Sequence, residues 1–306
     1  MIKTKKIQLD DFIVPINING LHGRMLRLPS PKARKREILL IYGQHSNLER
    51  YFGLAELFND FGGVTMPDLP GFGGMGSFYK IGEKPTLDNL ADYMATFIKL
   101  RYRGRRLSIA AISFGFAVVT RMLQKYPDIA KKIDLVISIS GYVRHDEFNL
   151  GRSRYFLLRF GSWLLSSRLL SVFFRNIALH PYVIRGYYKR FAELPPKLSA
   201  SDQQKIIDFE VYLWRCNDLR THMYTTNARL RLDNCTGSVK IPVWYVHADM
   251  DVSLDSAVVE QHMQVVFSDF HAVSVKREAG KFYIFGDKKT ARKLISPQLR
   301  HVLRQI

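Results

Sequence analysis

The sequence contains little cysteine and no long apolar run, and each shortage excludes a class of protein. Its 306 residues include two cysteines, Cys216 and Cys235. Two cysteines cannot form a disulfide scaffold, and their spacing is not that of a metal site, so we expect a reducing, cytoplasmic environment and no bound metal. No stretch of about 18 uncharged apolar residues occurs, which argues against a membrane-spanning helix. Residues 1–11 lack the apolar core of a signal peptide.

Acidic residues are also scarce, and the chain therefore carries a large positive charge. Asp and Glu number 27 against 46 Lys and Arg, which gives a net charge of +19 and an isoelectric point of about 9.9. Such a charge favours anionic partners such as nucleic acid, acidic lipid or an acidic protein, although a basic surface can also serve solubility alone. We expect no specific nucleic-acid binding, because the isoelectric point by itself is weak evidence for it.

Alternating apolar and amphipathic segments predict an α/β fold. An extended segment at 6–18 precedes Asn19-Gly20, a strong hairpin signal, and a returning strand at 21–28. Short apolar runs, typical of buried parallel strands, then alternate with helical segments. The predicted strands are 38–42, 63–66, 107–112, 135–139, 241–246 and 271–275; the predicted helices are 49–59, 87–102, 116–125, 256–267 and one that opens at Ser296-Pro297. We expect a mostly parallel twisted sheet with helices on both faces.

This alternation breaks between about 145 and 235, where the chain becomes helical, aromatic and basic. Residues 151–200 contain nine Lys or Arg and one acid, Glu193. Pro195-Pro196 separates this part from a predicted helix at 202–215. A helical insertion between the sixth and seventh strands is typical of a cap. We therefore divide the chain into a first part of the core (1–144), a helical cap (145–235) and a second part of the core (236–306).

One serine lies where a predicted buried strand meets a predicted helix, in the sequence Ala111-Ile112-Ser113-Phe114-Gly115. A serine on such a sharp turn adopts strained backbone angles, and small residues are needed two positions before and after it. The following helix directs its N-terminus toward any anion that forms on a substrate. We expect Ser113 to have a positive φ and to face a cavity covered by residues 150–230. An ordinary tight turn is the alternative interpretation.

A glycine-rich loop follows the fourth predicted strand, with the sequence Asp68-Leu69-Pro70-Gly71-Phe72-Gly73. Together with the Ser113 turn, and in the same chain order, this loop resembles the α/β-hydrolase superfamily. The resemblance covers nearly the whole chain outside the cap, and it is greatest to cap-bearing esterases and similar acyl hydrolases.

The same loop also matches a dinucleotide-binding pattern through Gly71, Gly73 and Gly76. That pattern needs a helix directly after the glycines, whereas here a loop with Pro85 intervenes. We therefore expect no nucleotide and no other cofactor.

The resemblance also implies roles for residues in the loops after the third and seventh strands and at the Ser113 turn. The loop Gly43-Gln44-His45-Ser46 would supply the backbone N–H of Gln44 to an oxyanion hole, and Phe114 would supply the second N–H. His45 would shape this loop or pack against the cap rather than act as a base. Asp251, in the sequence His247-Ala248-Asp249-Met250-Asp251, takes the position of the catalytic acid, and Asp249 is the near alternative. A structural turn carboxylate is the other interpretation of both.

The catalytic histidine of this family is missing from its expected place. A Gly-His pair should follow the eighth strand, but the sequence reads Ala279-Gly280-Lys281-Phe282. A lysine base must be a neutral amine, and a nearby Asp251 would instead favour the ammonium form of Lys281. We therefore expect a salt bridge at this position rather than a Ser–Lys dyad.

The other histidines offer no clear replacement. His271 begins the last predicted strand, and ten extended residues put it roughly 30 Å from Lys281. His22 and His301 lie in the first hairpin and the last helix. The remaining candidates, in or near the cap at no fixed distance from Ser113, are His145, His180 and His222.

The segment from Tyr155 to Leu179 is rich in leucine and aromatic residues and is punctuated by Arg159, Arg168 and Arg175. It could lie on an anionic membrane and admit lipid-like acyl chains. An ordinary cap would instead turn its apolar face to the pocket and its arginines to water. We expect the ordinary cap, with a weak, salt-sensitive association with acidic membranes.

Two functions follow from these residues. The first is a serine hydrolase of a small ester or amide substrate, with Ser113 as nucleophile, Asp251 as acid and Lys281 at the position of the base. The second is a non-catalytic protein of the same fold that binds a ligand, a protein partner or an anionic membrane surface. We expect a cytoplasmic protein, at the membrane periphery if the cap binds lipid.

Overall fold

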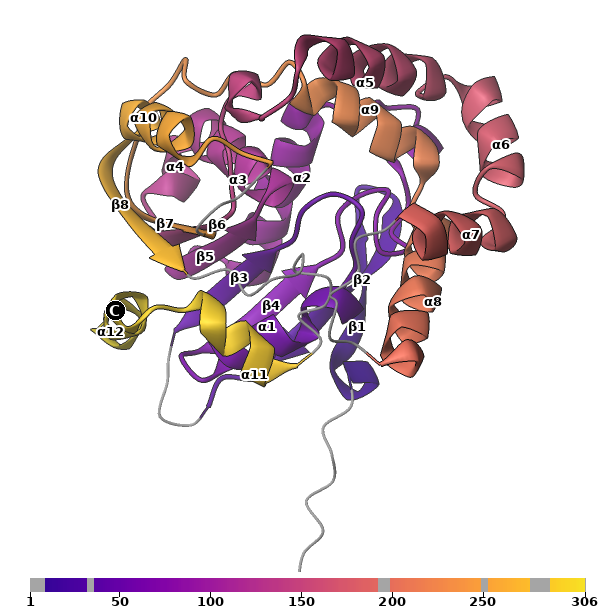
Figure 1. Cartoon of the computed structure of the whole chain (residues 1–306). Coiled ribbons are helices and arrows are strands. Elements are labelled where there is room, and N and C mark those ends of the chain that lie inside the picture. Colours follow the sequence, from indigo (N-terminus) through magenta and orange to yellow (C-terminus); the bar gives the residue numbers. More distant parts are fainter. Residues whose placement is uncertain (1–8, 32–35, 192–198, 249–252, 276–286, 306) are drawn as a thin grey trace, which may run out of the picture.

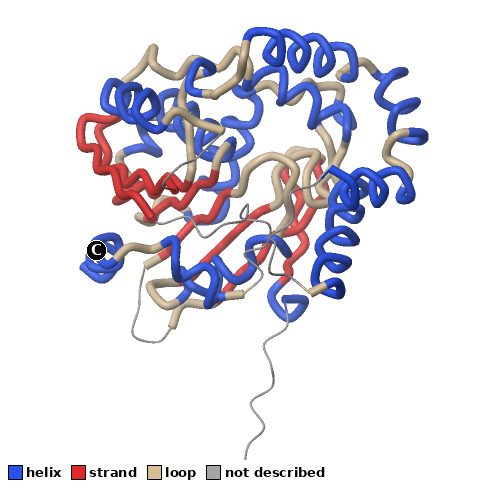
Figure 2. Tube along the Cα trace, viewed as in Figure 1, coloured by secondary structure: helices blue, strands red, loops and turns tan. Residues whose placement is uncertain are grey.

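The computed structural model describes residues 9–31, 36–191, 199–248, 253–275 and 287–305, and its centre is a single sheet (Figures 1 and 2). Within this part of the chain eight strands have the order β1-β2-β4-β3-β5-β6-β7-β8. β1 (Ile13–Ile18), β2 (Leu21–Leu28) and β4 (Gly63–Pro67) pair antiparallel. The parallel strands that follow are β3 (Glu37–Ile41), β5 (Leu107–Ile112), β6 (Ile133–Ile139), β7 (Val239–Ala248) and β8 (Phe267–Val275). The predicted fold class is confirmed.

The first hairpin forms as the sequence predicts. Ile18 pairs with Leu21, so Asn19 and Gly20 are the two turn residues, and their φ angles are +52° and +80°. Positive φ at both positions is the requirement of a type I′ turn, which Asn and Gly meet most readily. Leu9–Phe12, which we expected to be part of the first strand, instead forms a 3₁₀ turn, η1.

Helices cover both faces of the sheet because successive strands are added first toward one edge of the sheet and then toward the other. The connection from β3 to β4 contains η2 (Glu49–Tyr51) and α1 (Phe52–Asn59) and runs toward one edge. The connections through α2 (Leu87–Tyr102) and α3 (Phe114–Lys125) run toward the other edge. Right-handed crossovers in opposite directions place their helices on opposite faces. Every residue of β4 and of β5 is accordingly buried.

The remaining elements of the core complete these two layers. α11 (Lys288–Ala291) packs against α1, and α10 (Ser256–Val266) packs against β8 (Figure 1). β8 begins directly after α10, four residues earlier than predicted, so His271 lies in the middle of the strand rather than at its start. The short elements are η3 (Phe78–Ile81), α4 (Pro127–Ala130), η4 (His145–Glu147), η5 (Arg292–Leu294) and the last helix α12 (Pro297–Gln305).

Between β6 and β7 the described residues form five α-helices, which lie beyond the carboxyl ends of the parallel strands (Figure 1). They are α5 (Arg152–Leu165), α6 (Arg168–Ile177), α7 (Pro181–Phe191), α8 (Ala200–Cys216) and α9 (Leu219–Arg229). α9 packs against α5, and α7 packs against α8. These helices cover the point where β3 and β5 lie side by side and the crossovers change direction, which is where open α/β sheets bind ligands.

Candidate active site

Ser113 occupies a strained turn between β5 and α3. Its φ is +51° and its ψ is −121°, and its N–H donates to the carbonyl oxygen of Ile139 at 3.0 Å. A non-glycine residue in this region costs on the order of 1–3 kcal/mol and persists where the surrounding structure enforces it. The predicted positive φ at the strand-to-helix turn is therefore confirmed, and the Ser113 side chain is half-buried.

The loop after β3 lies directly against this turn. A Cβ atom added to Gly43 would lie 3.2 Å from Cβ of Ser113 and 3.5 Å from the backbone nitrogen of Phe114. The N–H groups of Gln44 and Phe114 donate no hydrogen bond to any residue that the structure describes. A helix leaves its first N–H groups without partners inside the helix. Two free N–H groups beside a serine hydroxyl are the arrangement that stabilises an oxyanion.

Polar contacts hold helix α9 against the loops that follow β3 and β4. Nε2 of Gln44 donates to Oγ1 of Thr225 at 2.6 Å. Oγ1 of Thr221 lies 2.8 Å from Oγ of Ser77, and the N–H of Asp218 donates to the carbonyl oxygen of Gly71 at 2.8 Å. Helix α9 is thus held to the Gln44 loop after β3 and to the glycine-rich loop after β4.

Two residues that the sequence did not single out are Tyr142, which contacts the Ser113 hydroxyl, and Arg229, which contacts Tyr142. Burial, the largest effect, raises the pKa of Tyr142, and contacts with Arg229 and with the Ser113 hydroxyl offset it in part. The guanidinium of Arg229 lies over the ring of Phe148, 5.0 Å from its centre. Neither the Tyr142 hydroxyl nor Nε of Arg229 has a hydrogen-bond partner of ordinary geometry among the described residues. The Tyr142 hydroxyl beside Ser113 and Nε of the adjoining Arg229 therefore lack a hydrogen bond of ordinary geometry that a bound molecule could supply.

Comparison with known proteins identifies the fold. No family model and no curated protein matches the sequence. A thermophilic esterase from Thermogutta terrifontis has a similar structure, with a TM-score of 0.65 and 13% identity over 96% of this chain and 98% of the esterase. A bacterial membrane phospholipase A gives 0.64 and 15% over 96% and 87%, and an epoxide hydrolase gives 0.63 and 14% over 94% and 99%. This chain has the α/β-hydrolase fold. The resemblance to α/β-hydrolases that the sequence indicates is thus confirmed for the fold.

Within this α/β-hydrolase fold, the glycine-rich loop after β4 has a structural role. The buried carboxylate of Asp68 accepts hydrogen bonds from the Tyr42 hydroxyl at 2.6 Å and from Nε of Arg24 at 2.8 Å. Burial raises the pKa of Asp68 to about 7, against the lowering effect of Arg24. The φ of Gly73 is +61°, and a Cβ there would collide with the Asp68 carboxylate. The packing around the buried Asp68 carboxylate therefore explains the glycine at position 73, and no bound nucleotide is needed to explain it.

A buried charged cluster joins the loop after β3 to helix α8. Glu210 of α8 pairs with Arg50, accepts a hydrogen bond from the Tyr188 hydroxyl at 3.0 Å and lies 3.4 Å from Nε2 of His45. Burial acts to raise the pKa of Glu210, but the contacts with His45 and Arg50 outweigh it and lower that pKa. His45 also has a positive φ of +50°. The expectation that His45 shapes its loop fits these contacts.

The structure does not describe the residues expected to be the catalytic acid and to stand at the position of the base. Asp251, its alternative Asp249, and Lys281 all fall outside the described residues. The structure does place several other histidines. Nδ1 of His145 lies 3.0 Å from the carbonyl oxygen of Leu232, and His271 is half-exposed beside Asp269. His222 of α9 packs near His45, with ring centres 5.4 Å apart.

His222 is expected to make the protein less stable in mild acid. Burial lowers the pKa of His222 to about 3, with smaller contributions from the neighbouring His45 and Arg229. The unfolded chain takes up a proton below about pH 6.5 while the folded protein does not, so the free energy of unfolding falls as the pH decreases from about 6.5 toward 3. Between pH 7 and pH 5 we expect a loss of about 1–2 kcal/mol in wild type that Phe or Gln at position 222 removes.

Denaturant unfolding of wild type and His222→Gln at both pH values measures this difference. His180→Gln is the matched control, because His180 is exposed on the cap. Equal pH dependence in wild type and His222→Gln would show that the folded protein accommodates the charged imidazole.

Proposed function

We propose that the protein is a serine hydrolase that cleaves an ester or similar acyl bond with Ser113 as its nucleophile. The observation that carries the proposal is the strained Ser113 turn, held against two backbone N–H groups without partners among the described residues. Strain of this kind at a polar residue is characteristic of sites where function requires the geometry.

The proposed reaction has two steps. The Ser113 hydroxyl loses its proton to a base while its Oγ attacks the carbonyl carbon of the substrate, and the carbonyl oxygen becomes an oxyanion. The N–H groups of Gln44 and Phe114 and the N-terminus of α3 stabilise that charge. The alcohol departs with a proton, and water then attacks the acyl-serine and releases the carboxylic acid. By resemblance, Asp251 is the acid and Lys281 stands at the position of the base.

The Arg229 guanidinium, which adjoins the Tyr142 side chain next to Ser113, points to the kind of substrate. Nε of Arg229 and the Tyr142 hydroxyl lack hydrogen bonds of ordinary geometry among the described residues, although the two side chains contact each other. A substrate with a carboxylate or another anionic group near the scissile bond would satisfy both donors. We therefore propose a small acyl substrate that carries such a group.

Covalent labelling of Ser113 tests this proposal. A fluorophosphonate transfers its phosphonyl group to an activated serine and releases fluoride, so we expect a mass increase on the peptide that contains Ser113. Ser113→Ala should abolish the label. Ser140→Ala is the matched control, because Ser140 is another serine with a positive φ, +46°, at the end of the neighbouring strand β6.

The label also distinguishes the two functions that the sequence allows. Labelled Ser113 together with slow hydrolysis of p-nitrophenyl esters would identify a hydrolase with a weak base. Folded protein that takes up no label at a large excess of reagent would refute the proposal and favour a non-catalytic binding protein of the same fold.

A further inference from the structure

Helices α5 and α6 expose their apolar side chains and bury polar ones. Ser162 is the buried residue of α5 and Ser171 that of α6. The exposed large side chains on these two helices are Phe156, Leu157, Leu158, Phe160, Trp163, Leu164, Leu169, Leu170, Val172, Phe173, Phe174 and Ile177. We call this set the α5–α6 surface. The expectation that the cap turns its apolar face to the pocket is therefore wrong for these helices.

Polar contacts with α9 explain this orientation. Nδ2 of Asn227 donates to the carbonyl oxygen of Arg159 at 2.9 Å and lies 3.3 Å from Oγ of Ser162. Nε of Arg220 donates to the carbonyl oxygen of Ser166 at 3.0 Å. The small polar side of α5 thus fits against α9, and the wide apolar side remains outside. Leu169 is 84% exposed and Phe156 65% exposed, which is unusual for so many neighbouring apolar residues on a soluble protein.

Positive charge surrounds the α5–α6 surface. Residues 152–177 contain no Asp or Glu. Arg152, Arg154 and Arg168 are exposed and form no ion pair with any carboxylate that the structure describes. A partner for this surface must therefore offer an apolar region for the exposed apolar side chains and negative charge for the arginines around them.

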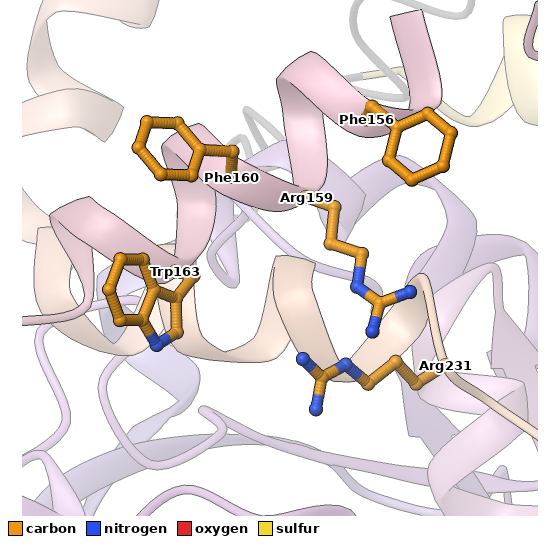
Figure 3. Close-up of a pocket in the computed structure, with 5 residues that line it drawn as sticks. All are labelled: Phe156, Arg159, Phe160, Trp163 and Arg231. Atoms are coloured by element: carbon orange, nitrogen blue, oxygen red, sulfur yellow. The ribbon is translucent and has the colours of Figure 1, made fainter. Parts of the chain in front are cut away.

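A pocket at one end of this surface brings both properties together. It has a volume of about 280 Å³ and is lined by Phe156, Arg159, Phe160, Trp163 and Arg231. Figure 3 shows the guanidinium groups of Arg159 and Arg231 pointing toward one another, with the aromatic rings carried along α5. Neither arginine pairs with a carboxylate in the described part of the chain. A phosphate oxygen pair between them would offset their repulsion and accept charge-assisted hydrogen bonds.

The lengths of the two helices favour a position in the membrane surface. No single described helix is long and apolar enough to cross a bilayer, and the axes of α5 and α6 differ by 101°. Fourteen residues of α5 extend about 21 Å, short of the roughly 30 Å hydrocarbon layer. Amphipathic helices with basic flanks and Trp, Phe and Leu on the apolar side lie in the headgroup region.

We propose that the α5–α6 surface docks on a bilayer of anionic phospholipid and that the pocket between Arg159 and Arg231 receives a lipid phosphate. A second copy of this chain fits the surface less well. A twofold interface would bring the unpaired arginines of both copies together, and like charges oppose such an interface.

Vesicle binding tests the proposal directly. Full-length protein should sediment with vesicles of 70% phosphatidylcholine and 30% phosphatidylglycerol at low salt, and much less with phosphatidylcholine alone. Trp163 is 58% exposed in the free protein, so its fluorescence should shift to the blue on binding and be quenched by brominated lipid. Trp163→Phe should remove that signal. Ser113→Ala should bind like wild type, so this experiment is independent of the proposed hydrolase activity.

Paired variants separate the apolar and the charged contributions. Phe160→Ser with Phe173→Ser should lower the partition coefficient at least tenfold, because both exposed rings enter the lipid. Arg159→Gln with Arg231→Gln should lower it about 10- to 30-fold. Lys131→Gln with Lys132→Gln is the matched control. It removes the same charge at the amino end of β6, away from the cap, and should change binding less than about threefold.

Three results would overturn the proposal. The first is no sedimentation with the anionic vesicles at low salt. The second is equal loss of binding in the two double charge variants with none in Phe160→Ser/Phe173→Ser, which would mean attraction by net charge alone. The third is a dimer in sedimentation velocity that the Phe160→Ser/Phe173→Ser variant converts to a monomer, which would make a second copy the occupant.

Discussion

Gly115→Ala is expected to lower the free energy of unfolding by about 2–3 kcal/mol, as overpacking of a tight contact does. A Cβ atom on Gly115 would lie 2.5 Å from the carbonyl oxygen of Tyr42 and 2.9 Å from that of Ile41. Both atoms belong to the backbone at the end of β3, in the centre of the sheet, and neither can rotate away. The variant must push the Gln44 loop away from Ser113, so ester hydrolysis and fluorophosphonate labelling should fall with stability.

Chemical denaturation measures the change, and Gly161→Ala is the control. Gly161 lies inside α5, and apart from its chain neighbours and the backbone of its own helix no described atom lies within 4 Å of the point that an alanine methyl group would occupy. Alanine there should therefore raise stability by roughly 0.5–1 kcal/mol through helix propensity. A Gly115→Ala protein with wild-type stability and labelling would contradict the prediction. It would show that the loop after β3 can move to admit the methyl group, and that its close contact with the Ser113 turn is not required for the geometry of the site.

The core and the Ser113 turn were predictable because local rules decide them. Asn19-Gly20 can form one kind of tight hairpin turn, and short apolar runs between helical segments leave little choice but a parallel sheet. The small residues around Ser113 likewise indicate a strained turn, and its φ of +51° agrees. Tyr142 could have been found by the same reasoning, since it follows the carboxyl end of β6 next to the strand that carries Ser113.

The arrangement of the cap could not be predicted, because it depends on contacts between distant parts of the chain. Periodicity reveals that α6 has one apolar side, but not whether that side faces protein or water. Asn227 and Arg220 decide it by bonding the polar side of α5. Arg50 and Glu210 pair although they are 160 positions apart in the sequence, and no local sequence pattern predicts such a contact.

Lys281→His is expected to raise the hydrolysis of a p-nitrophenyl ester by about 10²- to 10⁴-fold, the usual contribution of a positioned general base. Lys281 follows β8, where the family places its histidine, and Asp251 follows β7. An ammonium group at that position supplies no lone pair to remove the proton of Ser113. An imidazole there could accept the proton while Asp251 orients its other nitrogen. The rate should rise with pH around 6.5, the ordinary pKa of an imidazole.

The variants around this change show which group acts. The gain should vanish in Lys281→His combined with Ser113→Ala, and Lys281→Gln, which removes the charge without adding a base, should gain nothing. Fast wild-type hydrolysis that Lys281→Ala abolishes would make the lysine itself the base and refute the salt-bridge argument. If wild-type hydrolysis is fast and Lys281→Ala does not slow it, another residue accepts the proton of the Ser113 hydroxyl. His145, in the loop after β6, is then the first to replace. His222 follows, because its lowered pKa keeps it neutral at pH 7 and α9 holds it above the oxyanion loop.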